Sequence, residues 1–316
     1  MRSLSTVIAG TAAMIFILTA CGGGKILTNQ PDHLPEALLN GNYSGIYERF
    51  SPEFKQQVSE PEVAEMGAAF MEGVQSFKPS SMLVLNGTEQ RAWASDAGDK
   101  GITAVFDDQG MILGLQLAGL TAYPETDKTL TRTAITLPLK GEWLVYWGGH
   151  NVLDNYHYEH ESQRYAYDFV QAVDGFSYTG DPLRNESYHA FGKEVTAPAD
   201  GVVTEVVNDI PDNSPVGVMN EKAPAGNVVV IDHGGEYSFL AHLKEGSVTV
   251  KKGDVVKTGD IIGKLGNSGN SSEPHLHFHV SDGTDLLSSR SLNIQWKDDL
   301  QPLRGQTVTG TNNVNP

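Results

Sequence analysis

The chain has little of three things: cysteine, positive charge and long apolar runs. Cys21 is the single cysteine among 316 residues, so no disulfide can form within the chain. Lysine and arginine total 22 residues against 39 aspartates and glutamates, which gives a formal net charge of −17. Nucleic acids and anionic lipid headgroups repel such a surface, so we expect neither of them as a partner.

The main apolar run lies close to the start of the chain. It covers residues 7–20 behind Arg2, is too short to span a bilayer comfortably, and predicts a signal peptide over residues 1–20. It ends in "LTAC", which resembles the bacterial lipobox, and the resemblance implies that Cys21 is lipidated and becomes the first residue of the mature chain. The alternative is a plain secretory signal with an incidental cysteine. Lipidation predicts an exported protein anchored to a membrane of the bacterial cell envelope, with residues 21–30 as a glycine-rich tether.

Residues 31–118 have the pattern of a small α+β domain, because helical segments come first and strand-like runs follow. Ser51 and Ser59, each followed by a proline, predict two helix starts. The second of these helices is expected to bury an apolar face made of Val63, Met66, Phe70 and Val74. The runs "LLNGNYSGIYERFSPEFKQQVS" and "VFDDQGMILGLQL" resemble nuclear-transport-factor-like domains. No catalytic cluster is visible here, so we expect this domain to be dispensable for chemistry.

Residues 129–304 read differently, as short strands separated by glycine, aspartate and asparagine turns. This pattern predicts a mainly β domain, a sandwich or barrel. The turns in "VTAPADGVV" and "VKKGDVVKTGDIIGKLG" are typical of barrel-sandwich hybrids, which include biotinyl and lipoyl carriers. A carrier needs a modified lysine in a tight hairpin tip such as "MKM" or "DKA", and none is present. The polar residues 305–316 predict a disordered tail.

Three histidines alternate with apolar residues in "EPHLHFHV", residues 273–280. Side chains of a β-strand alternate between its two faces, so His275, His277 and His279 are expected on one face and the apolar residues on the other. The apolar face can pack on a core. The imidazoles must then face water, a metal ion or a substrate.

Four segments together resemble the lysostaphin-type zinc metallopeptidases, which cleave peptidoglycan cross-bridges: "APADGVV", "GNVVVIDHGGEYSFLAHL", "KKGDVVKTGDIIGKLGNSG" and "PHLHFHV". The resemblance implies a duplicated hybrid motif, Zn²⁺ as the cofactor and peptidoglycan peptides as the substrate. It implies that Asp168 and His277 bind zinc. It also implies that His275 is a general base or a donor to the transition state, and that His242 hydrogen-bonds the water or the developing oxyanion. His279 stands where family members often carry an acidic or polar residue, and we expect it to support the site without binding the metal.

One ligand of the family pattern H-x-x-x-D is missing. Arg164 stands four residues before Asp168, and a guanidinium group has no lone pair to donate. Asp168 and His277 alone would supply two ligands, whereas a catalytic zinc normally has three from the protein. Two functions follow: a zinc metalloendopeptidase, or a catalytically inactive module of the same fold that binds the cell wall or activates another hydrolase. Degenerate relatives usually lose several site residues together, so the residues that remain favour the enzyme.

Three histidines upstream of Arg164 are candidates for the missing ligand: His150, His157 and His160. His160 would need its loop to fold back sharply, and His150 follows a strand-like run directly. His157 lies eleven residues before Asp168, which is enough for a loop to return, and its "NYH" context resembles family members that carry "QR-x-A-x-D". We predict zinc bound by His157, Asp168 and His277, with Arg164 nearby as an anchor for the loop or for a substrate carboxylate.

Overall fold

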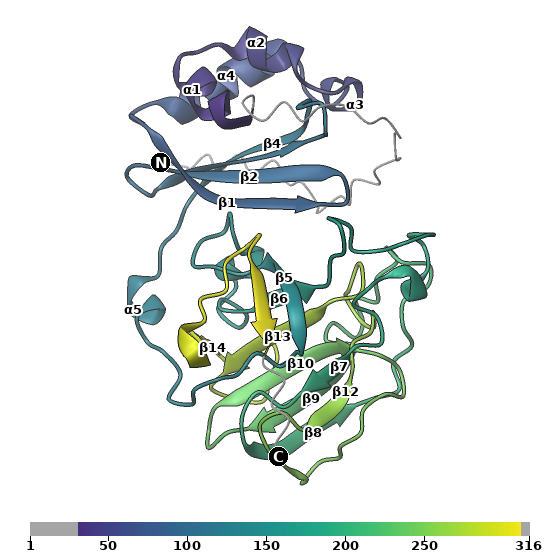
Figure 1. Ribbon diagram of the computed structural model, residues 1–316. Helices are drawn as coiled ribbons and strands as arrows, with labels where there is room; N and C mark the ends of the chain where they lie inside the picture. Colours follow the sequence, from purple (N-terminus) through teal and green to yellow (C-terminus); the bar gives the residue numbers. More distant parts are fainter. Residues whose placement is uncertain (1–30, 311–316) are drawn as a thin grey trace.

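The computed structural model describes residues 31–310 (Figure 1). The expected signal peptide, Cys21 and the tether lie outside these residues, as does the end of the chain from residue 311. No helix within residues 31–310 is long and apolar enough to cross a membrane. The described chain is mainly β-sheet with few helices, and the sequence predicted a mainly β fold for its C-terminal part.

The N-terminal part, from residue 31 to residue 119, places helices on one face of an antiparallel sheet whose strand order is β1-β2-β3-β4 (Figure 1). The helices are α1 (Leu34–Leu39), α2 (Tyr43–Glu48), α3 (Pro52–Lys55) and α4 (Glu60–Met71), preceded by a 3₁₀ turn, η1 (Pro31–His33). The strands are β1 (Phe77–Leu85), β2 (Thr88–Ser95), β3 (Lys100–Phe106) and β4 (Ile112–Gly119).

Both helix starts predicted from serine and proline are confirmed. The Ser51 hydroxyl accepts a hydrogen bond of 3.1 Å from the backbone N–H of Phe54 at the start of α3. At the start of α4, Ser59 and Glu62 form a capping box, in which the Glu62 carboxylate accepts from the Ser59 backbone N–H at 2.8 Å. Orphan N–H groups at both helix starts are thereby satisfied.

The predicted apolar face of α4 is right at Val63 and wrong at Met66. The helix buries Val63, Gly67 and Met71, whereas Met66 is 37% exposed, and the helix ends before the last predicted position. The reason is a close approach at Gly67: a Cβ there would lie 2.4 Å from the ring of Tyr43 on α2. The smallest residue therefore sets the contact face, and Met66 turns toward solvent.

The C-terminal part is built on a large sheet with the strand order β11-β8-β9-β10-β13-β6-β5-β15, with β14 also paired to β13 and a separate pair β7–β12. The first strands are β5 (Gly141–Trp147), β6 (Tyr167–Val170), β7 (Glu194–Thr196), β8 (Gly201–Val207), β9 (Asn227–Asp232) and β10 (Tyr237–Leu243). They are followed by β11 (Val255–Val256), β12 (Ile261–Lys264), β13 (Leu276–Ser281), β14 (Ser291–Leu292) and β15 (Thr307–Gly310). Short helical turns are α5 (Pro124–Asp127), η2 (Tyr156–Glu159), η3 (Asn185–Ser187) and η4 (Lys297–Asp299).

The predicted start of a disordered tail at residue 305 is wrong for residues 305–310. Strand β15 pairs with β5 and places Thr307 opposite Leu144, and Val308 opposite Trp143. Val308 is 5% exposed and belongs to the main apolar core. The polar composition of the segment hid a short strand in which one apolar side chain faces inward.

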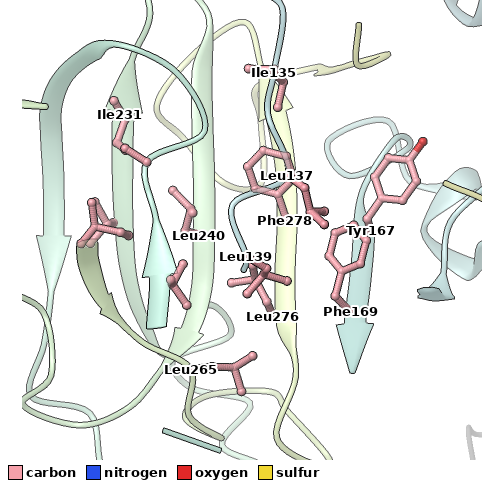
Figure 2. Packing of buried hydrophobic residues seen from close by; sticks show 14 of the residues in the cluster. Ile135, Leu137, Leu139, Tyr167, Phe169, Ile231, Leu240, Leu265, Leu276 and Phe278 are labelled. Carbon is pink, nitrogen blue, oxygen red and sulfur yellow. The ribbon is translucent and has the colours of Figure 1, made fainter. Parts of the chain in front are cut away.

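Strand β13 has the two-faced character that its sequence predicted. Leu276, Phe278 and Val280 are fully buried in the core, where Figure 2 shows Leu276 and Phe278 beside Leu240. His277 therefore faces the opposite side of the sheet. The apolar face fixes the register of β13, because a slip by one residue would turn the histidines into the core.

The two parts of the chain touch along the face of the N-terminal sheet that the helices leave free (Figure 1). Leu83 and Leu85 of β1 form one buried cluster with Leu144 and Val170 of the C-terminal part. Burial of each such side chain contributes about 2 kcal/mol, so this contact stabilises the arrangement of the two parts.

Candidate metal centre

Three of the predicted site residues converge between neighbouring strands and one loop. Strand pairing sets His277 on β13 directly opposite Asp168 on β6, and the turn η2 supplies His157. His277 Nδ1 lies 3.0 Å from Asp168 Oδ1, and His157 Nε2 lies 3.7 Å from Asp168 Oδ2. One ligand atom from each residue lies within 4.8 Å of the other two, so these three residues form a possible metal site.

The His157 ring has a lone pair on Nε2 that accepts no hydrogen bond. Its Nδ1 lies 2.9 Å from the side-chain oxygen of Asn155, which also accepts from the His157 backbone N–H at 3.2 Å. An amide oxygen only accepts, so Nδ1 carries the proton and Nε2 keeps its lone pair. That Nε2 is buried and has no hydrogen-bond partner, which is uncommon for a buried polar atom. A metal ion at this position would satisfy it.

The protonation states suit metal binding. Burial lowers the pKa of His157 to about 3, so its imidazole is neutral. Burial opposes ionisation of Asp168, yet the imidazoles of His157 and His275 and the hydrogen bond to His277 hold the pKa of this carboxyl below its usual range. An ionised carboxylate and neutral imidazoles are the forms that bind a cation.

His279 supports His277 and does not join the ligand group. Its Nδ1 lies 3.1 Å from Nε2 of His277, and its ring stacks on Phe239 with 4.5 Å between the ring centres. His277 Nδ1 donates to Asp168 in the structure, and a metal ion would take the place of that proton, with Nε2 of His277 then donating a hydrogen bond to Nδ1 of His279. Orientation of a ligand imidazole through its second nitrogen is common in metal sites.

His242 reaches the site through an irregularity in β10. The pairing of β10 with β9 shifts register between Leu240 and Leu243, and His242 has a φ of +61°. A bulge turns a side chain away from its regular direction, and a positive φ is uncommon for a residue with a Cβ. The imidazole of His242 thereby lies 4.8 Å, between ring centres, from that of His275.

His242 and His275 are held in the same tautomer. Nδ1 of His242 lies 2.8 Å from the carbonyl oxygen of Ser268, and Nδ1 of His275 lies 2.9 Å from that of Glu273. A carbonyl oxygen only accepts, so each Nδ1 donates its proton and each neutral ring keeps a lone pair on Nε2. His275 Nε2 lies 3.7 Å from Asp168 Oδ1, which places this lone pair beside the candidate metal ligands.

The other two histidine candidates lie apart from the ligand group. His150 and His160 are both exposed, and His150 Nε2 contacts the side-chain oxygen of Asn293 at 3.2 Å. Arg164 donates from Nε to the backbone oxygen of Tyr158 at 3.1 Å, and its guanidinium lies 3.5 Å from the ring centre of Tyr123. At 7% exposure, Arg164 fits the predicted role of a loop anchor better than that of a substrate contact.

Asn155 and Tyr156 have positions in the site that the sequence analysis did not assign. The amide nitrogen of the fully buried Asn155 lies 3.0 to 3.3 Å from three backbone oxygens, those of Gly149, Arg164 and Ala166. The ring of Tyr156 lies 3.9 Å from that of His157. The only sequence signal was the "NYH" context, in which a short polar residue stands two positions before the predicted ligand.

Asn155→Ala is expected to weaken zinc binding by about 10- to 100-fold, because the His157 ring loses the acceptor that fixes its tautomer. Competition with a chromophoric chelator measures the dissociation constant. Asn185→Ala is the matched control, since Asn185 is also buried and bonded, to Asn213 and Asn267, but touches no ligand. Equal weakening in the two variants would contradict a positioning role for Asn155.

Comparison with protein families finds a similarity within the C-terminal part. Residues 187–288 match the model of Peptidase family M23. This stretch of the chain is therefore similar to Peptidase family M23, and the matched range includes His242, His275 and His277. His157 and Asp168 precede that range, in the segment where the sequence departs from the H-x-x-x-D pattern.

Curated relatives match short stretches of the chain. Peptidoglycan DD-endopeptidase ShyA of Vibrio cholerae serotype O1 is 44% identical over 64 residues, which are 20% of this chain and 15% of that protein. An uncharacterized metalloprotease of Haemophilus influenzae is 38% identical over 93 residues, 28% of this chain and 17% of that protein. The chain therefore covers less than a fifth of the length of these relatives.

Among solved structures, the catalytic domain of lysostaphin from Staphylococcus simulans is 23% identical, with 40% of this chain and 73% of that chain covered and a TM-score of 0.26. A zinc-containing peptidase from Vibrio cholerae is 18% identical, with 61% of this chain and 52% of that chain covered and a TM-score of 0.25.

Proposed function

We propose that this protein is a zinc metalloendopeptidase that hydrolyses peptide cross-links of peptidoglycan. The observation that carries the proposal is the buried group of His157, Asp168 and His277 with the Nε2 lone pair of His275 beside it. Two imidazoles and one carboxylate are the ligand type of catalytic zinc sites. The M23 match and the similarity to a peptidoglycan DD-endopeptidase support the substrate class.

A bound zinc ion would polarise the scissile carbonyl and acidify a water molecule. His275 is placed to accept a proton, because its Nε2 lone pair faces Asp168 while the Glu273 carbonyl holds Nδ1. Burial, with the nearby rings of His275 and His277, keeps the pKa of His242 well below its usual value. The neutral His242 ring can therefore accept a hydrogen bond from the attacking water at Nε2.

The sheet face that carries His277 and His279 also has room for a substrate peptide. His279 and Phe239 are cross-strand partners, and a hollow of about 320 Å³ continues from Phe239 over Val228 and Val230. Its lining is mainly apolar, with Glu205 and Asp285 at the edge. We propose that the chain next to the scissile bond lies along this hollow.

The complete ligand group favours the enzyme over the inactive cell-wall-binding or hydrolase-activating module. Arg164 cannot bind zinc, but His157 reaches the ligand group from the loop, so the site has three donors in spite of the arginine. A module without catalytic activity has no need of a buried, unpartnered imidazole nitrogen such as His157 Nε2.

The function is tested with protein that begins at Lys25, incubated with purified sacculi. We expect release of soluble fragments with new amino and carboxyl ends at peptide cross-links, intact glycan strands, and no release by Asp168→Ala. Mass spectrometry of the products identifies the bond that is cut. Cleaved glycan strands, or equal release by wild type and Asp168→Ala, would contradict the proposal.

We also propose that the protein is exported and held at the cell envelope by lipid on Cys21, on the basis of "LTAC" alone. Cys21→Ser is expected to move the protein from the membrane fraction to the soluble fraction, because acyl chains need the thiol. Immunoblots of fractionated cells measure the distribution. Normal processing and membrane attachment of Cys21→Ser would overturn the lipid anchor.

A further inference from the structure

The loop that carries His157 is held from outside by the N-terminal sheet. Asp154, three residues before His157, is 5% exposed, and its carboxylate accepts a hydrogen bond of 2.5 Å from the hydroxyl of Ser80 and another of 2.5 Å from that of Ser81. Asn151 of the same loop donates to this carboxylate at 2.6 Å. The buried guanidinium of Arg304 offsets the charge of Asp154 through space, while two of the three direct hydrogen bonds to the carboxylate come from hydroxyls of another part of the chain.

A β-bulge makes this double contact possible. Consecutive side chains of a regular strand point to opposite faces, so Ser80 and Ser81 would not normally reach one carboxylate. The pairing of β1 with β2 shifts register between Pro79 and Ser81, which leaves Ser80 as the extra residue. A bulge at a sheet edge is a common means of redirecting a side chain. Strand β1 is the edge strand of its sheet, where Pro79 is also tolerated.

Packing next to Asp154 reinforces the contact. Leu153 is 4% exposed and lies against Gly101 of β3, where a Cβ would come within 2.6 Å of the leucine side chain. Asp154 is followed directly by Asn155, whose side-chain oxygen orients the His157 ring. A displacement of the loop at Leu153 and Asp154 would therefore move the acceptor that holds His157.

The segment that links the two parts holds the other side of the loop. The Tyr158 hydroxyl donates to the Asp127 carboxylate at 2.8 Å and accepts from the backbone N–H of Tyr123 at 3.1 Å. Tyr123 also lies against the guanidinium of Arg164. His157 thus lies between one anchor in the N-terminal sheet and a second anchor in the linker.

We propose that the N-terminal domain is a structural part of the metal centre: Ser80 and Ser81 hold Asp154 so that His157 reaches Asp168. The inference rests on the proposed zinc site and gives the domain a role that the sequence did not reveal. It replaces the expectation that this domain is dispensable for chemistry. These two hydrogen bonds, called the clamp below, hold the loop of a histidine that lies eleven residues before Asp168, whereas the H-x-x-x-D pattern has its histidine four residues before the aspartate.

The test uses the full chain with Ser80→Ala and Ser81→Ala combined. We expect zinc to bind at least about 10-fold more weakly, as for loss of other outer contacts of a metal site, and the amides of residues 149–166 to exchange hydrogen faster. The double threonine variant keeps both hydroxyls and should bind zinc more tightly than the alanine variant. Asn86→Ala is the matched control, because Asn86 bonds Ser177, outside the ligand loop, at 3.0 Å.

Unchanged zinc affinity together with unchanged amide exchange in the double alanine variant would overturn the clamp. Equal effects of Asn86→Ala would do the same, because they would indicate general loosening of the domain contact. A wild-type chain that binds no zinc would instead refute the proposed function. Amide exchange of the loop needs no metal, so it still tests the clamp in that case.

Discussion

His277→Ala should lose zinc and hydrolysis together, whereas His275→Ala should lose hydrolysis and keep its zinc. His277 Nδ1 faces Asp168 at 3.0 Å within the ligand group. His275 is outside that group, and its Nε2 lies 3.7 Å from the same carboxylate oxygen. Loss of a general base lowers turnover by about 10²- to 10⁴-fold, while loss of a ligand removes the metal itself.

Zinc per chain, measured by atomic emission, and turnover of a cross-linked peptide separate the two effects. His189→Ala is a suitable control, since His189 contacts Thr179 and none of the site residues. It should keep both zinc and activity. Equal loss of zinc in His275→Ala and His277→Ala would show that the two histidines have been given the wrong roles.

The second large effect concerns the histidine of the H-x-x-x-D pattern, which this chain lacks at position 164. Among His150→Ala, His157→Ala and His160→Ala, only His157→Ala is expected to lower zinc affinity steeply. His157 is 1% exposed with its Nε2 facing Asp168, whereas His150 and His160 are exposed at the protein surface. The same chelator competition that measures wild-type affinity measures all three variants.

His150→Ala and His160→Ala serve as matched controls, because each removes one imidazole from the same loop region. If none of the three variants binds zinc more weakly, the metal-free module gains support over the enzyme. If His150→Ala or His160→Ala has the steep effect, the loop adopts a different arrangement around the metal from the one described above.

Local patterns in the sequence predicted the strand face of the histidines and the starts of two helices. Alternation in "PHLHFHV" placed His277 on a strand face opposite Leu276 and Phe278, because the strand period of two is a property of the backbone. Caps at Ser51 and Ser59 were readable because capping bonds span three residues. The three residues predicted as zinc ligands lie together in the structure, and their binding of zinc stays a prediction.

Contacts between residues far apart in the chain could not be predicted from the sequence. The bond between Ser80 and Asp154 joins residues 74 positions apart, and it depends on a bulge that no local sequence pattern announced. The apolar face of α4 was misassigned because the ring of Tyr43, on another helix, packs at Gly67. Strand β15 was missed because its pairing with β5 joins segments more than 160 residues apart, and polar composition alone suggested disorder.

The most direct test of the zinc site as the source of activity is a titration of metal-free protein with zinc while cleavage of a cross-linked peptide is followed. Activity should be absent without metal, rise linearly and reach its plateau at one zinc ion per chain. The Asp168→Ala variant should stay inactive throughout. Full activity in the metal-free protein, or a plateau unrelated to one ion per chain, would contradict hydrolysis at His157, Asp168 and His277.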